Sequence, residues 1–130
     1  NKDMPYVLGQ KSREGIKSIL GMFMKANVPK KIKPFVGNRI ENIEIIPAYG
    51  HTPGHTCFRY KNVFFAGDLL SESKGKLSPA PSIMTWNKKM LLDSCRKMNG
   101  MVKGVEWICP AHGEPVKVKD TWEEFINSLQ

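Results

Sequence analysis

Two histidines and one aspartate in this chain, His55, Asp68 and His112, each lie beside a glycine at the end of an apolar run. Imidazole nitrogens and carboxylate oxygens are common ligands of zinc and similar divalent ions. A metal ion held by such groups lowers the pKa of a bound water to about 7 and supplies hydroxide as a nucleophile. Asp68 is the one member with two oxygens that could bridge two ions. The set suits a hydrolytic metal centre, although ordinary turn residues would give the same dispersed pattern.

The residues between His55 and Asp68 are typical of a β-hairpin. Two apolar runs flank the pair Lys61-Asn62, which can form a two-residue turn. If Tyr60 lies opposite Val63, the same register places His55 opposite Asp68. Directly opposed residues of an antiparallel pair have Cα atoms roughly 4.5–5.5 Å apart. The predicted register therefore brings the first two candidate ligands together.

The rest of the chain alternates between helical and extended patterns. Hydrophobic spacing predicts helices over residues 11–26, 87–98 and from 120 to 129, and strands over residues 40–47 and 105–110. Asn99-Gly100 is expected to end the second helix, and Asp120 or Thr121 to cap the last one. This order predicts an α/β fold in which helices cover a sheet.

Residues 69–86 contain Ser, Gly and Pro and are expected to form a long connection without regular structure. Three apolar residues, Ile83, Met84 and Trp86, are expected to fix this connection to the body of the protein or, alternatively, to line a pocket. A second tryptophan, Trp107, is expected in the core. The lid-like residues 71–86 within this connection are expected to help decide the substrate.

Length and composition bound the class of protein. A chain of 130 residues with 41% hydrophobic residues fits one domain, and no apolar run is long enough to span a membrane. Three cysteines without a CxxC spacing argue against a disulfide framework, which favours a reducing, cytoplasmic compartment. The net charge of +8 is scattered, so we expect a solvated basic surface and no nucleic-acid partner.

Three segments together resemble the last three metal-binding motifs of the metallo-β-lactamase superfamily. They are Thr52-Pro53-Gly54-His55-Thr56, Phe65-Ala66-Gly67-Asp68 and Cys109-Pro110-Ala111-His112-Gly113. The resemblance implies that His55 binds one metal ion, that Asp68 bridges two ions and is also the catalytic residue, and that His112 binds the second ion. It implies a dinuclear site with zinc, or alternatively iron or manganese, that hydrolyses an ester, thioester or related bond of a small-molecule substrate.

The resemblance is partial, because the family's upstream HxHxDH motif does not occur in the sequence. It therefore implies that residues 1–130 form a single partial domain, the C-terminal half of a four-layer αββα sandwich from a parent hydrolase. The chain alone is expected to bind metal weakly or not at all and to be inactive. His51 has no ligand role in the family pattern and is expected to be a supporting loop residue. The alternative function is a non-catalytic or degenerate α/β binding module.

A half-sandwich also leaves one face of its sheet without the second sheet. The hairpin register places Phe58 and Phe65 on one face, and Cys57 and Ala66 on the other face with the candidate ligands. We therefore expect an exposed apolar sheet face, or a partner that covers it. That partner would be the missing N-terminal half or a second copy of the chain.

Overall fold

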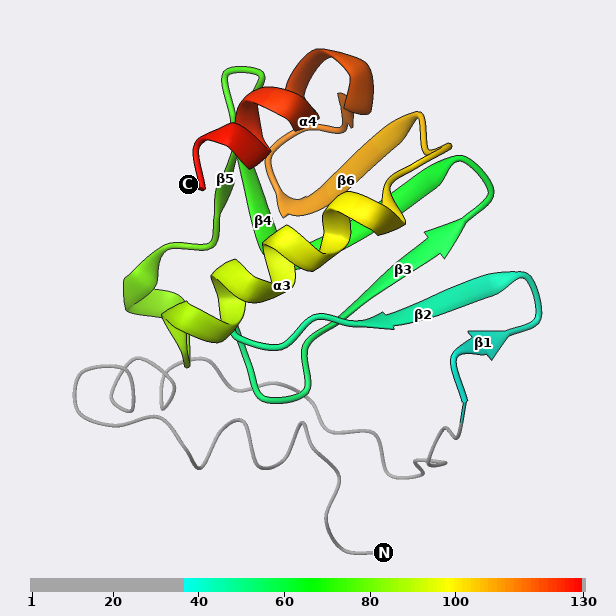
Figure 1. The fold of residues 1–130 in the computed structure, drawn as a ribbon, viewed down its shortest axis with the longest axis horizontal. Helices are drawn as coiled ribbons and strands as arrows, with labels where there is room; N and C mark the ends of the chain where they lie inside the picture. Colours follow the sequence, from blue (N-terminus) through cyan, green and yellow to red (C-terminus); the bar gives the residue numbers. More distant parts are fainter. Residues whose placement is uncertain (1–36, 130) are drawn as a thin grey trace, which may run out of the picture.

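The structure is a computed structural model, and it describes residues 37–129 (Figure 1). The helix predicted over residues 11–26 lies outside these residues. The strands are β1 (Arg39–Ile40), β2 (Ile43–Pro47), β3 (Thr56–Tyr60), β4 (Val63–Ser73), β5 (Lys76–Pro79), β6 (Trp107–His112) and β7 (Val116–Lys117). The helices are the 3-10 turn η1 (Ser82–Met84), α3 (Lys88–Met101) and α4 (Val118–Asn127).

The described strands form one mixed sheet in the order β1-β2-β3-β4-β6-β7, with β5 paired to β4 beside this path. β4 and β6 run parallel, and the other pairs are antiparallel. The predicted hairpin is confirmed, because Tyr60 pairs with Val63 and Phe58 pairs with Phe65. Its turn begins at Lys61, whose φ of 53° lies in the left-handed region. The sheet and its helices confirm the predicted α/β class.

Residues 69–86 were expected to lack regular structure, and this prediction is wrong. β4 continues to Ser73, and β5 pairs back along it from Ser73–Lys76 to Leu70–Pro79. The sequence pattern did not predict this second hairpin, because its exposed positions carry serine and lysine. These residues break the apolar alternation by which strands were recognised. Ile83 and Met84 do not fix the segment, since they are 60% and 37% exposed.

The C-terminal end of α3 and the N-terminal start of α4 both differ from the predictions. α3 begins at the cap residue Asn87, whose side chain accepts a hydrogen bond from the backbone N–H of Met90, and it passes through Asn99-Gly100 to Met101. α4 begins directly after β7, and no side chain caps it. Asp120 therefore lies inside its first turn, where a carboxylate favours the positive end of the helix.

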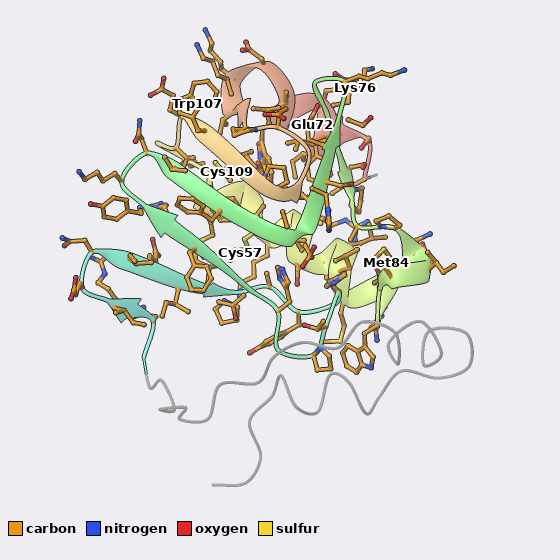
Figure 2. The ribbon with its side chains drawn as sticks, turned by 180° about the vertical axis from the view of Figure 1, so that it is seen from behind. Cys57, Glu72, Lys76, Met84, Trp107 and Cys109 are labelled. Carbon is orange, nitrogen blue, oxygen red and sulfur yellow. The ribbon has the colours of Figure 1, made fainter. Side chains whose placement is uncertain are left out.

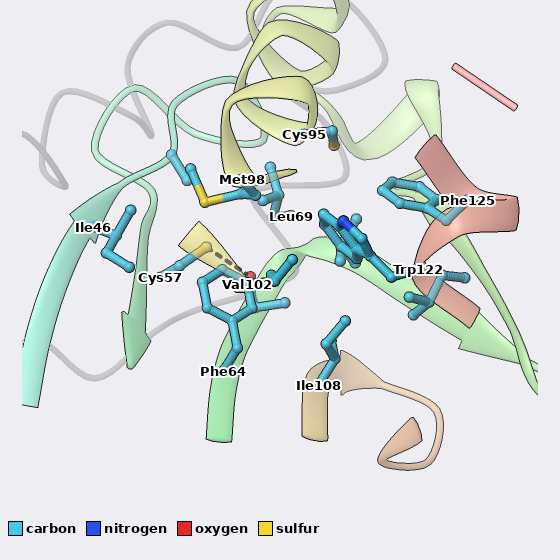
Figure 3. Packing of buried hydrophobic residues seen from close by; sticks show 14 of the residues in the cluster. Ile46, Cys57, Phe64, Leu69, Cys95, Met98, Val102, Ile108, Trp122 and Phe125 are labelled. Atoms are coloured by element: carbon cyan, nitrogen blue, oxygen red, sulfur yellow. Dashed lines mark hydrogen bonds between the residues drawn. The ribbon is translucent and has the colours of Figure 1, made fainter. Parts of the chain in front are cut away.

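The hydrophobic core lies between the sheet and the two helices (Figure 3). Its sheet side consists of fully buried residues that include Phe64, Ala66 and Ile108. α3 contributes residues at helical spacing, and Trp122 and Phe125 of α4 contact each other with ring centroids 5.2 Å apart. The thiols of Cys57 and Cys95 are buried here. Packing in this core holds β3, β4 and β6, the strands next to the candidate site residues, against the two helices.

The opposite side of the sheet, the open face, is apolar, and no helix of the described part covers it (Figure 2). Cross-strand partners share one side of a sheet, so the pairing defines the residues of this face. They are Ile43, Ile45, Phe58, Tyr60, Val63, Phe65, Trp107 and Cys109. The sequence predicted an exposed apolar face, and the described part of the chain has one.

Candidate metal centre

Asp68 lies on β4 at an irregular point of the sheet. The parallel pairing of β4 with β6 shifts register on both sides of Gly67, which has a φ of 55°. A residue other than glycine rarely adopts this backbone conformation, so the chain bends just before the aspartate. The Asp68 side chain is 39% exposed. The carboxylate is thus held on a strand yet remains open to solvent.

Two imidazoles lie near the two oxygens of this carboxylate. Nε2 of His112, at the end of β6, lies 3.3 Å from Oδ1 of Asp68. Nε2 of His51 lies 3.9 Å from Oδ2. The family resemblance implied that Asp68 and His112 share one site, and the structure brings their side chains together.

His51 was expected to be a supporting loop residue, and the structure places its Nε2 3.9 Å from Oδ2 of Asp68. Its loop folds back because the backbone N–H of Gly50 and that of His55 both donate to the carbonyl of Thr52. The backbone N–H of Trp86 donates to the His51 carbonyl and ties the loop to the start of α3. Two histidines four residues apart in one turn were a signal in the sequence that either ring could face Asp68.

His55 does not lie directly opposite Asp68 in the sheet. The β3–β4 pairing ends at Phe58–Phe65, and the bend at Gly67 interrupts the register before it reaches the two residues. Nδ1 of His55 lies 3.0 Å from the carbonyl oxygen of Ala48, which a protonated Nδ1 would donate to. Its Nε2 lies against Gly67, where an added Cβ would come within 2.9 Å. The His55 ring therefore lies against the backbone bend at Gly67, next to Asp68 in the chain, and not directly opposite Asp68.

Burial lowers the pKa of His55 below its usual value, and the Ala48 carbonyl opposes this effect. The neighbouring His51 lowers the pKa further, while Asp68 raises it. The two rings meet edge to face with centroids 6.0 Å apart. A neutral His55 that donates from Nδ1 would keep a lone pair on Nε2, as metal-binding histidines do.

The donors present fit part of a metal site. Imidazole and carboxylate groups suit zinc or iron, and the two oxygens of Asp68 each have an imidazole nearby. Among residues 37–129, however, no group of three His, Cys, Asp or Glu residues is arranged to hold one ion. The described residues therefore bring together donor groups that suit a metal ion, without forming a complete site.

The comparisons with known proteins identify the fold. No protein-family model matches the chain, and no curated protein matches its sequence. Solved structures do match, and they include metallo-β-lactamase superfamily proteins. None of the helices in the described residues is long and apolar enough to cross a membrane.

Three of the matching structures illustrate the similarity. The archaeal superfamily protein ST1585 from Sulfolobus tokodaii is 22% identical with a TM-score of 0.54, over 66% of this chain and 32% of its own. TTHA1623 in a di-iron-bound form is 21% identical with a TM-score of 0.56, over 70% and 46%. VMB-1 is 19% identical with a TM-score of 0.55, over 80% and 48%. The chain spans a third to a half of these proteins, and it therefore has part of the metallo-β-lactamase fold.

Proposed function

We propose that this chain is part of a metal-dependent hydrolase that acts on an ester, thioester or related bond. The observation that carries the proposal is the meeting of His51 and His112 at the two oxygens of Asp68. It occurs in a chain that shares its fold with metallo-β-lactamase superfamily proteins. Fold alone does not define chemistry, so the proposal rests on this group of side chains.

Within the proposed site, Asp68 and His112 supply metal ligands together with one imidazole of the His51–His55 turn. The family resemblance favours His55, and the geometry favours His51, whose Nε2 lies nearer the carboxylate. Asp68 would be shared between two ions, with zinc as the expected metal. One of the matching proteins, TTHA1623, has a di-iron-bound form, which keeps iron as the alternative.

A bound metal would supply a hydroxide nucleophile at neutral pH. The chain's own residues provide the carboxylate of Asp68 and the imidazoles of His51 and His112 beside its oxygens. Catalytic zinc usually has three protein ligands, and the described residues do not gather three on one ion. We therefore propose that the chain alone is inactive and that a complete active site requires further ligands.

Zinc titration of the metal-free chain by calorimetry tests the metal proposal. We expect weak binding that Asp68→Asn reduces at least tenfold, because the central carboxylate loses its charge. Asp93→Asn is the matched control, since Asp93 forms a surface ion pair with Arg96 on α3. Comparing His51→Ala with His55→Ala decides which ring binds the ion. Zinc binding that Asp68→Asn leaves unchanged would contradict the proposal.

The alternative is that the chain is a binding module with no catalytic role. The open face favours binding to another protein surface, because it exposes Phe58, Tyr60 and Phe65 side by side. We propose that a complementary half of the same fold, or a second copy of the chain, covers this face in the assembled protein. Either partner is compatible with the hydrolase.

Sedimentation velocity tests whether copies of the chain pair through the open face. If they do, Phe65→Lys shifts the population from dimer to monomer, since a charge would be buried in an apolar interface. Asn127→Lys adds the same charge at the end of α4 and should leave the dimer intact. A monomer at all concentrations would exclude the second copy and leave the complementary half as the proposed partner.

A further inference from the structure

We propose that Glu72 is a positioning residue that holds His112 beside Asp68. This inference rests on the proposed function, because it concerns how one proposed ligand reaches its place. Glu72 lies four residues after Asp68 on β4, near the turn into β5 (Figure 2). It belongs to none of the three segments that carry the family resemblance.

The Glu72 carboxylate joins two loops that are distant in the sequence. Oε1 accepts a hydrogen bond from the backbone N–H of Gly75 at 2.6 Å. Oε2 accepts one from the backbone N–H of Glu114 at 2.6 Å. These two N–H groups hold the pKa of Glu72 below its usual range, Glu114 more strongly than Gly75. The carboxylate therefore stays ionised and accepts both bonds at neutral pH.

The loop after His112 packs tightly on this contact. Gly113 has a φ of 103°, and a Cβ at this position would come within 2.4 Å of the Glu72 carbonyl oxygen and 2.5 Å of Oε2. Only glycine permits such a close approach of backbone to backbone. His112 also pairs with Ser71, the residue before Glu72, in the parallel ladder of β4 and β6. The backbone on both sides of His112 is thus fixed to β4.

The His112 side chain has little else to hold it. It is 73% exposed, and among the described residues its one polar contact is with Asp68. An exposed ring at the end of a strand depends on its backbone for its position. Since Glu72 fixes the backbone N–H of Glu114, it sets where the His112 ring lies relative to Asp68.

A graded series of variants tests the inference on the metal-free chain. Glu72 offers two carboxylate oxygens, Glu72→Gln offers one carbonyl oxygen, and Glu72→Ala offers none. We expect amide exchange at Gly75 and Glu114 to accelerate in this order. We also expect nuclear Overhauser contacts between the His112 ring and the Asp68 side chain to weaken in the same order. Glu114→Ala is the matched control, because it removes a neighbouring carboxylate and keeps the N–H that Glu72 binds.

Zinc titration of the same variants connects the position of His112 to metal binding. Loss of a residue that orients a ligand typically weakens metal affinity 10–100-fold. We expect Glu72→Ala to fall in this range, Glu72→Gln to lie between, and Glu114→Ala to match the unchanged chain. If the unchanged chain binds no zinc, the metal proposal fails, and the ring contacts still decide the role of Glu72. Ring contacts that persist in Glu72→Ala would overturn the inference whatever the zinc result.

Discussion

The two sides of the sheet have similar side chains and opposite surroundings. Phe64 and Phe65 are neighbours on β4, and Phe64 is fully buried under the helices while Phe65 is 43% exposed on the open face. Cys57 and Cys109 show the same contrast, one buried and one partly exposed. Residue type therefore does not decide burial in this sheet. What decides it is whether another layer of the fold lies above that side.

The two neighbouring phenylalanines give the largest expected difference. Phe64→Ala should lower the free energy of unfolding by about 3–5 kcal/mol, because it leaves a cavity in a packed core. Phe65→Ala should lower it by about 1 kcal/mol or less, since its ring is already partly in water. Urea denaturation of both variants measures the difference. Equal losses would show that the open face is covered in solution.

The buried thiols give a pH dependence to the helix-covered side. Burial raises the pKa of Cys57 well above its usual value and that of Cys95 to about 12. An unfolded cysteine ionises near pH 8.5 and a buried one does not. The stabilisation is therefore complete below about pH 8.5 and is lost as the pH rises toward 12, by up to about 1.4 kcal/mol per pH unit for each thiol.

Urea denaturation between pH 8 and 10.5 tests this dependence. Cys95→Ala should be less stable at neutral pH and should lose less stability as the pH rises, because one titrating thiol is gone. Cys109→Ala is the comparison from the open face. An unchanged slope in Cys95→Ala would show that its thiol is accessible to solvent and ionises in the folded protein.

The contacts of Trp122 on the covered side and Trp107 on the open face give the smallest expected difference in stability between the two sides. Nε1 of Trp122 donates to Oδ1 of Asn99 at 3.0 Å on the covered side, and Asn99→Ala should cost about 1 kcal/mol. On the open face Nζ of Lys117 lies 5.3 Å from the centroid of Trp107, and Lys117→Met should cost about 0.5 kcal/mol. Thermal unfolding measures both. A larger cost for Lys117→Met would reverse the proposed ranking of the two sides.

The parts of the fold that sequence reasoning predicted are local ones. The β3–β4 hairpin follows from alternation around a two-residue turn, and α3 follows from three-and-four spacing after the cap residue Asn87. The β4–β5 hairpin was missed because its exposed residues are polar and its apolar signal is weak. The start of α4 was misplaced because β7 runs directly into it without a capping side chain.

In the candidate site, too, some features could be predicted from the sequence and others depend on the tertiary structure. The sequence by itself determined which residue types could form the candidate site, and its family resemblance implied that Asp68 and His112 share that site. In the structure Nε2 of His112 lies 3.3 Å from Oδ1 of Asp68. Only the tertiary structure decided that His51 reaches the carboxylate and that His55 lies behind Gly67. The physical reason is the left-handed backbone at Gly67 and the register shift between β4 and β6. Both arise from packing between strands that are distant in the chain, which no local pattern encodes.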